Sequence, residues 1–545
     1  MVRTLVPICA LLLLAADAAG RGRDIVLERG QGDDTATVGK ALAEVADGDT
    51  IRLGGGEWEF RPESAARIHL GVSNNSSGEK KVIFNLQGKR DVTIDGGGAR
   101  LVFVRDAFPF ALRGMTNVVL RNFTIDTPIA PVTAFSVVEK GESGFRVRFE
   151  KSAPPFRIED GRFAVETPYG WSRLDLLSVH AVERMYVDYF YLPHCTRDKN
   201  TLPTRFVAVD PEPLNGREVF FRYRCDDHPK SVRCMFPVGE KLCINLASDR
   251  TCVACLFEGC RDVRVENVTI RQFGGMGVVA QRCENVALDH YRVLPSEGHV
   301  ISTSADAVML TNCGGDCRLT HCEISHSMDD ALNVHGNYLE VVSAQGDRVE
   351  LRMRHHEQKG FLPYRTGDRV EFVEPRRRDV VAAGRVLSAR LTADDRVELV
   401  TDAPLGRVVP GTVVENVTLC PDVTLTDNRF SDYPHIRLAG RGKMTIERNR
   451  MERSFIALYF YDLLEYWFEA GRLRDVTVRN NVFDDCNRMG GDAFIKIGLT
   501  GWKATDADVP RIHEGITIRD NAFRNVRTRR LEAYGVRNLA TDITD

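Results

Sequence analysis

The sequence predicts an all-β protein whose body is a right-handed parallel β-helix, a solenoid with two small β-barrel-like insertions. Three observations predict it. Short segments alternate β-branched or aliphatic residues with polar ones, these segments carry Asn or Asp at their turns, and they return at intervals of roughly 20 to 30 residues. At 545 residues the chain is also longer than one compact core requires.

The repeated segments are the predicted strands of the coils. Alternation with a period of two is typical of strands, and Asn at the following turn tolerates a left-handed backbone while its amide can pair with Asn on the next coil. The copies span residues 90–95, 117–125, 261–270, 284–288, 316–324, 422–430, 443–451, 475–483 and 515–523.

The two ends and two interruptions complete the predicted layout. An amphipathic helix pattern over 38–45 precedes the first coil, where a helix would cover an otherwise exposed apolar end. Two stretches lack the Asn-bearing repeat and contain hairpin-like alternation instead, for example at 144–149 and 348–352. The predicted divisions are a signal peptide (1–19), N-terminal coils with the capping helix (20–127), a β-rich insertion (128–245), central coils carrying the site (246–335), a β-barrel-like insertion (336–415) and C-terminal coils (416–545).

The first residues predict export. Arg3 supplies a positive start, residues 5–16 form an apolar run, and Ala16-Asp17-Ala18 resembles a cleavage site. No other stretch approaches the roughly eighteen apolar residues that crossing a bilayer requires. We therefore expect an exported protein without a membrane span, located in the periplasm, at the cell surface or in the medium.

Charge and cysteine content narrow the partners. Lys plus Arg number 73 against 76 Asp plus Glu, so the net charge of −3 argues against nucleic acid or an anionic membrane and suits a neutral sugar. Of 14 cysteines, Cys9 belongs to the signal peptide, and most of the others lie between 195 and 322. Their spacing lacks the regular pairs of a zinc site, so disulfides or buried thiols are favoured, with an odd cysteine left over.

A column of aspartates is the candidate catalytic feature. Aligning the strand starts at 275–280, 305–310 and 329–334 places Asp306 over Asp330, 24 residues later, with Asp329 at the strand entry. Coils stack about 4.8 Å apart, so these side chains project side by side. Packed carboxylates repel, which raises the proton affinity of one and leaves another ionised, as glycoside cleavage requires.

An Asp-Asp pair alone is equally typical of a calcium site or of solvated turns. The alignment with Asp306 and the polar residues Asn333 and His335 after the pair favour a catalytic site. Asn333, His335, His299 and Ser304 are the candidate substrate-binding residues, and no metal ligand is assigned. Further residues that can line the same groove are Glu258, Tyr459, Tyr461 and Lys496, whereas Asp492 is interpreted as an ordinary solenoid position.

The strings Ser304-Ala-Asp306-Ala and Ser327-Met-Asp329-Asp330-Ala-Leu-Asn333-Val-His335-Gly resemble glycoside hydrolase family 110, the exo-acting α-1,3-galactosidases. The resemblance covers most of the mature chain, including both insertions. It implies hydrolysis, with inversion, of terminal α-1,3-linked galactose, as on blood-group B or linear α-galactosyl glycans. It also implies that Asp329 is the general acid, that Asp306 and Asp330 hold and activate water, and that no cofactor is needed. Residues 185–260 do not match the family position by position, so the preference for branched or linear substrates stays open.

Two other functions remain as alternatives. A polygalacturonase-like hydrolase shares a β-helix with clustered aspartates, but of that family's motifs this chain offers only the Asp-Asp pair, with weak echoes at Asn333 to Gly336 and at Phe494 to Lys496. A noncatalytic β-helix that binds glycans would not need three acids in one cleft. A homodimer is compatible with a solenoid face, although no sequence feature requires it.

Overall fold

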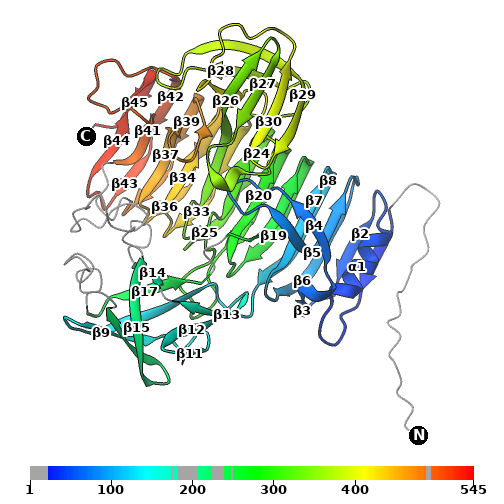
Figure 1. Ribbon diagram of the computed structural model, residues 1–545, viewed down its shortest axis with the longest axis vertical. Helices are drawn as coiled ribbons and strands as arrows, with labels where there is room; N and C mark the ends of the chain where they lie inside the picture. Colours follow the sequence, from blue (N-terminus) through cyan, green and yellow to red (C-terminus); the bar gives the residue numbers. More distant parts are fainter. Residues whose placement is uncertain are drawn as a thin grey trace.

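The computed structural model describes residues 22–174, 176–181, 206–223, 238–246, 250–486 and 493–544. The predicted signal peptide and Asp492 lie outside these ranges. Strands stacked side by side run from the N-terminal helix α1 (Thr35–Glu44) to the C-terminus, and two smaller groups of strands project from this stack (Figure 1). Within the described residues, no helix is long and apolar enough to cross a membrane.

The stack consists of parallel strands that pair from coil to coil in three columns. The first column contains β1 (Asp24–Leu27), β2 (Thr50–Leu53), β6 (Thr93–Phe103), β8 (Thr116–Asp126), β19 (Arg261–Ile270), β21 (Glu284–Asp289), β24 (Gly314–Thr320), β32 (Asp422–Thr426), β35 (Met444–Glu447), β39 (Arg474–Arg479), β42 (His513–Arg519) and β45 (Val536–Thr541). The second contains β3 (Glu57–Phe60), the later parts of β6, β8 and β19, and then β22 (Arg292–Val293), β25 (Glu323–Ser325), β33 (Arg429–Ser431), β36 (Arg450–Glu452), β40 (Val482–Asp484) and β43 (Ala522–Arg524).

The third column carries the candidate site. It contains β5 (Gly78–Gln87), β7 (Ala107–Arg113), β18 (Cys252–Glu258), β20 (Gly275–Gln281), β23 (Val308–Thr311), β26 (Leu332–Gln345), β34 (His435–Leu438), β37 (Ile456–Asp462), β41 (Ala493–Leu499) and β44 (Arg529–Ala533), with β4 (Ala66–Leu70) antiparallel to β5. The all-β class and the parallel β-helix predicted from the sequence are confirmed.

Alternation in the sequence explains how each coil buries its core. In β19 the side chains of Val263 and Val265 point inward and are fully buried, whereas Arg264 between them is exposed. The parallel register places Val263 opposite Val286 of the next coil, so aliphatic side chains stack along the solenoid. One continuous core extends from Ile25 to Ile518 as a result.

The turns after the first column explain the recurring Asn. In the C-terminal coils the residue with positive φ is followed by a buried asparagine, and these amides form a ladder with Nδ2–Oδ1 distances of 2.9, 3.0 and 3.0 Å along Asn428, Asn449, Asn481 and Asn521. Nearer the N-terminus, Asn267 itself has a φ of 53° and donates to Asn122. The predicted Asn pairing is therefore present, but in the C-terminal coils the left-handed residue and the ladder residue are neighbours rather than the same residue.

The N-terminal helix begins at Thr35, earlier than the pattern over 38–45 indicated. Its buried face, Val38, Ala41 and Leu42, joins the main core and closes the end of the first coil.

Two groups of antiparallel strands interrupt the coils. In the first, the strands that close a barrel are β9 (Val132–Lys140), β10 (Gly144–Phe149), β14 (Leu176–Ala181), β15 (Phe206–Asn215), β16 (Glu218–Tyr223) and β17 (Lys241–Asn245), beside a sheet of β11 (Phe156–Glu159), β12 (Arg162–Thr167) and β13 (Gly170–Leu174). In the second, the end of β26 pairs in a ring with β27 (Arg348–Arg352), β30 (Arg396–Thr401), β29 (Val380–Ala393), β28 (Arg369–Val373) and β31 (Val413–Asn416). Part of the first insertion lies outside the described residues, and the exact domain boundaries stay a prediction.

Several cysteines of the solenoid core are buried thiols. Those on three successive coils, Cys260, Cys283 and Cys313, lie fully or almost fully buried in the core, and the structure records each of them as free. Burial raises the pKa of several of these thiols, which keeps them protonated and disfavours metal binding.

Candidate active site

The aspartate column stands where β23 and β26 begin. The backbone N–H of Ala307 donates to the carbonyl of Asp330 at 2.9 Å, and the register of β23 with β26 pairs Met309 with Asn333. This register is the 24-residue offset used in the sequence alignment, so Asp306 and Asp330 occupy equivalent positions on adjacent coils. Asp329 precedes Asp330 and lies closer to solvent.

Burial sets the protonation of the two inner acids. Asp306 is 3% exposed and Asp330 is 5% exposed. Burial raises the pKa of Asp306 well above its ordinary value, and the charges of Asp329 and Asp330 raise it further. Burial and the charge of Asp329 also raise the pKa of Asp330. The pair therefore retains a proton at a pH where exposed carboxyl groups have lost theirs.

Asp329 belongs to a more open part of the site. Its side chain is 23% exposed and accepts a hydrogen bond of 2.5 Å from the guanidinium of Arg250. The same guanidinium lies 3.6 Å from Glu357, a fourth carboxyl group that the loop after β27 contributes. Burial raises the pKa of Glu357, while Arg250 acts in the opposite direction. If Asp329 donates a proton to a substrate, its ion pair with Arg250 has to loosen first.

His435, on the coil after Asp330, contacts that acid directly. Its Nδ1 lies 2.9 Å from Asp330 Oδ1. Burial lowers the pKa of His435 to about 4, so the ring is neutral near pH 7. A neutral imidazole can donate to a charged Asp330 or accept from a protonated one, and it therefore fits both forms of that acid.

The predicted binding residues Asn333 and His335 lie in a buried polar network rather than on the cleft surface. Asn333 accepts a hydrogen bond of 3.1 Å from Arg437, which is also paired with Glu469. His335 is 2% exposed, and its Nε2 lies 3.5 Å from Glu469. Asn333 and His335 are about as buried as Asp306 and Asp330, and their assignment to substrate binding stays a prediction.

The remaining predicted residues are placed as follows. Ser304 is buried close to Asp306 in sequence, and within the described part of the chain its hydroxyl has no hydrogen-bond partner. His299 lines a small depression beside Val132 to Ala134 of the first insertion, and the structure gives it no contact with the acids. Tyr459 packs against His435 at a ring distance of 5.3 Å, whereas Glu258 pairs with Arg282 elsewhere on the column.

Aromatic side chains lie near Arg250, the partner of Asp329, on the more solvent-exposed side of the site. The loop after β27 includes His355, whose ring centre lies 4.4 Å from that of Trp467. Trp467 lies in the loop 463–468 between β37 and β38 (Glu469–Ala470), and its ring is 6.0 Å from the guanidinium of Arg250. Tyr466 beside it is 65% exposed. Such exposed ring faces are suited to stacking against a sugar.

One cavity of the described structure lies away from the acids. It has a volume of about 390 Å³ and lies between the second insertion and the loops around 464 and 501, lined by Arg354, Arg376, Phe468 and Trp502 among others. None of the three aspartates borders it. We place the candidate site at the three aspartates because cleavage of a glycosidic bond requires carboxyl groups, and a cavity without them cannot catalyse it.

Sequence reasoning missed five groups of this site. Arg250, Glu357, His435, Arg437 and Glu469 lie between 79 residues before and 140 residues after Asp329. The sequence did contain one signal for His435 and Arg437. Once the second insertion is skipped, residues 435–438 form the next strand of the third column after the strand that follows Asp330. Arg250 and Glu357 come from outside the coil strands and carry no such signal.

Comparison with known proteins fits this geometry. The chain is 26% identical over 518 residues to α-1,3-galactosidase A of Bacteroides thetaiotaomicron, covering 90% of this chain and 85% of that protein. It is 27% identical to α-1,3-galactosidase A of Shewanella woodyi (92% and 81% covered) and 28% identical to α-1,3-galactosidase B of Phocaeicola vulgatus (81% and 73% covered).

Other comparisons are weaker. No protein-family model matches the chain. Among solved structures, polygalacturonase from Erwinia carotovora aligns with a TM-score of 0.42 at 9% identity, covering 97% of this chain and 100% of that one, but the fold rests on the strand register described above. The galactosidase similarity, in contrast, is a similarity of sequence, at 26% to 28% identity over 81% to 92% of this chain. The chain is therefore a relative of the α-1,3-galactosidases A and B, which confirms the resemblance to glycoside hydrolase family 110.

Proposed function

We propose that the protein is an exo-acting α-1,3-galactosidase that removes terminal galactose from glycans with inversion of configuration. The observation that carries the proposal is the pair of buried acids, Asp306 and Asp330, on adjacent coils beside the more open Asp329, in a chain related to α-1,3-galactosidases over about 90% of its length.

The proposed roles follow from exposure. A leaving-group oxygen arrives from the open side, so Asp329 is the group that reaches it and donates the proton. Before this step Arg250 exchanges Asp329 for Glu357 or solvent as the substrate binds, and the released Asp329 takes up from solvent the proton that it then donates. Asp306 and Asp330 hold the attacking water on the inner side, and one of them accepts its proton. Inverting enzymes place the acid and base about 6.5 to 9.5 Å apart to admit this water.

His435 holds Asp330 in place during this step. Nδ1–H of the neutral ring donates to Oδ1 of the ionised carboxylate, and the proton from water is taken up by the other oxygen, so the tautomer of His435 need not change. Export through the predicted signal peptide belongs to the same proposal, because an exported enzyme would meet glycans outside the cell.

The test is release of galactose from a substrate panel: a branched blood-group B trisaccharide, linear α-1,3-galactobiose, an α-1,4- and an α-1,6-galactoside, and polygalacturonate. NMR of the first-formed product identifies the anomer. We expect β-galactose from the α-1,3 substrates only. α-Galactose as the first product would contradict inversion, cleavage of polygalacturonate would favour the rival hydrolase, and binding without cleavage would indicate a noncatalytic protein. An Asp330→Asn variant is the matched control for contaminating activity.

A further inference from the structure

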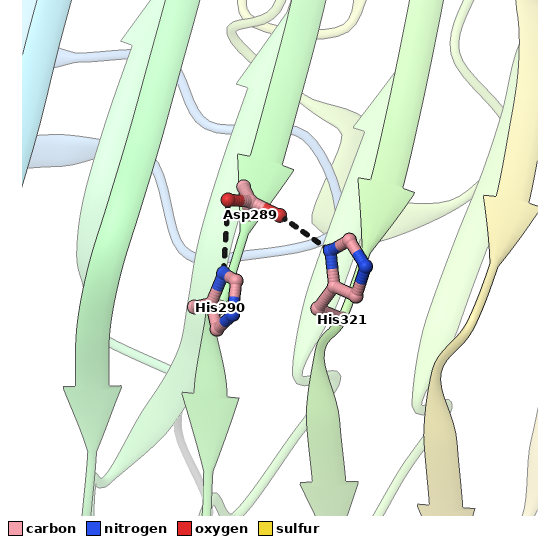
Figure 2. Close-up of side chains that lie close together, drawn as sticks. All are labelled: Asp289, His290 and His321. Carbon is pink, nitrogen blue, oxygen red and sulfur yellow. Dashed lines mark hydrogen bonds and ion pairs between the residues drawn. The ribbon is translucent and has the colours of Figure 1, made fainter.

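A second cluster of chemically reactive side chains lies on the outer surface of the first column, formed by Asp289, His290 and His321. Asp289 ends β21, His290 follows it, and His321 follows β24 on the next coil. Figure 2 shows the carboxylate between the two rings. One oxygen lies 2.9 Å from His290 Nδ1 and the other 3.0 Å from His321 Nδ1.

The solenoid itself produces this arrangement. The register of β21 with β24 pairs Asp289 with Thr320, so the residues that follow them, His290 and His321, occupy the same turn position on adjacent coils. Both have a left-handed backbone, with φ of 51° and 54°. Their rings stack with centres 5.0 Å apart and planes inclined by 22°. Elsewhere in this turn position the chain carries other types, such as Asn267.

We propose that Asp289, His290 and His321 form a binding site for a divalent transition metal of the zinc type. Two imidazoles and one carboxylate are a ligand set that zinc, nickel or copper prefers, whereas calcium and magnesium prefer oxygen alone. The three side chains offer ligand atoms that all lie within 4.8 Å of one another. Bonds of about 2.0 to 2.2 Å require these atoms to close slightly around an ion, and exposed rings can do this by rotation.

The carboxylate of Asp289 is held between the two rings and also accepts a hydrogen bond of 2.8 Å from the hydroxyl of Thr320. The neighbouring carboxylate of Asp427 is already paired with Arg448 through two contacts of 2.9 Å. Both rings are more than half exposed, at 51% and 55%, so an ion and its remaining waters can reach them.

The site would link the two coils that carry the acids. The coil of β21 continues to Asp306, and the coil of β24 continues to Asp329 and Asp330. A metal held by ligands from both coils binds the folded chain only, and therefore stabilises it. This inference is independent of the proposed function, because it concerns another face of the molecule.

The test is titration of the EDTA-treated full-length chain with zinc chloride at pH 7.5 by calorimetry, with calcium chloride as the second probe. We expect one zinc per chain, micromolar affinity, a raised Tm and no response to calcium. His321→Ala and His290→Gln should each weaken zinc binding at least tenfold, while His69→Ala, which removes another exposed histidine, should leave it unchanged.

Two results would overturn the proposal: no stoichiometric zinc binding by the wild-type chain, or binding that survives in both histidine variants. In either case the cluster is a hydrogen-bonded His-Asp-His bridge without a metal. The Tm of each variant in EDTA shows that the fold is intact, so lost binding is not mistaken for unfolding.

Discussion

Asp329→Asn separates proton donation from every other role of Asp329. Asn keeps the size of the side chain, and its Oδ1 can still accept from Arg250, which also retains Glu357 at 3.6 Å. The substitution therefore removes the proton and leaves the packing of the site in place. A general acid contributes about 10²- to 10⁴-fold to the rate, which corresponds to about 2.7 to 5.4 kcal/mol of barrier.

The assay compares two substrates with different needs for that proton. The leaving group of α-1,3-galactobiose is a sugar hydroxyl, which must be protonated as it departs. The leaving group of α-galactosyl fluoride is fluoride ion, which departs without being protonated. For Asp329→Asn we expect kcat/KM on galactobiose to fall about 10²- to 10⁴-fold and on the fluoride by less than about tenfold. Asp306→Asn, which disturbs the attacking water, should fail on both substrates.

An equal loss on both substrates would refute the assignment of Asp329 as the acid, since it would show a role in holding water or the galactose ring. Retained turnover on both would remove Asp329 from catalysis altogether. Thermal unfolding of the variant is the control, because a site that has collapsed would also lose both activities.

Three further predictions concern the acids and the coils. Burial raises the folded-state pKa of Asp306 above the unfolded value of about 3.9, so the folded chain binds more protons and loses stability as the pH rises from the unfolded pKa toward the folded pKa. The Tm of Asp306→Asn should therefore exceed that of the wild type by an amount that grows from pH 4 to pH 7. A difference in Tm that stays constant over this range would contradict the prediction. His435→Gln should lower kcat by about 10- to 100-fold with little change in KM, since it misplaces Asp330 without touching the sugar, and a pure KM effect in steady-state kinetics would argue against this role. Asn449→Ala breaks the buried amide ladder and should cost about 3 kcal/mol in urea unfolding, whereas exposed Lys443→Ala should change stability by less than about 0.5 kcal/mol.

The sequence predicted the repeated strands of the solenoid but not the site residues that come from segments between those strands. Alternation with a period of two identified the strands, and the 24-residue offset placed Asp306 over Asp330, because parallel pairing in register leaves one alignment that keeps aliphatic residues inside. The same logic could not reach Arg250 or Glu357, which come from segments outside the coil strands. The same logic did not show that His335, on the face of β26 opposite the core residue Val334, lies 3.5 Å from the buried Glu469.

The segments that interrupt the coils help to explain why the proposed enzyme would act on the end of a glycan. A β-helix surface is open along its length and suits a polymer that extends in both directions. Here Gln358 of the second insertion donates to the carbonyl of Trp467 at 2.7 Å, and Trp467 faces Arg250, the partner of Asp329. Three segments that are distant in sequence thus converge beside the most exposed acid. Segments that converge in this way favour one terminal sugar at the acids with the rest of the glycan outside, so the exo-action that we propose depends on the insertion as much as on the coils.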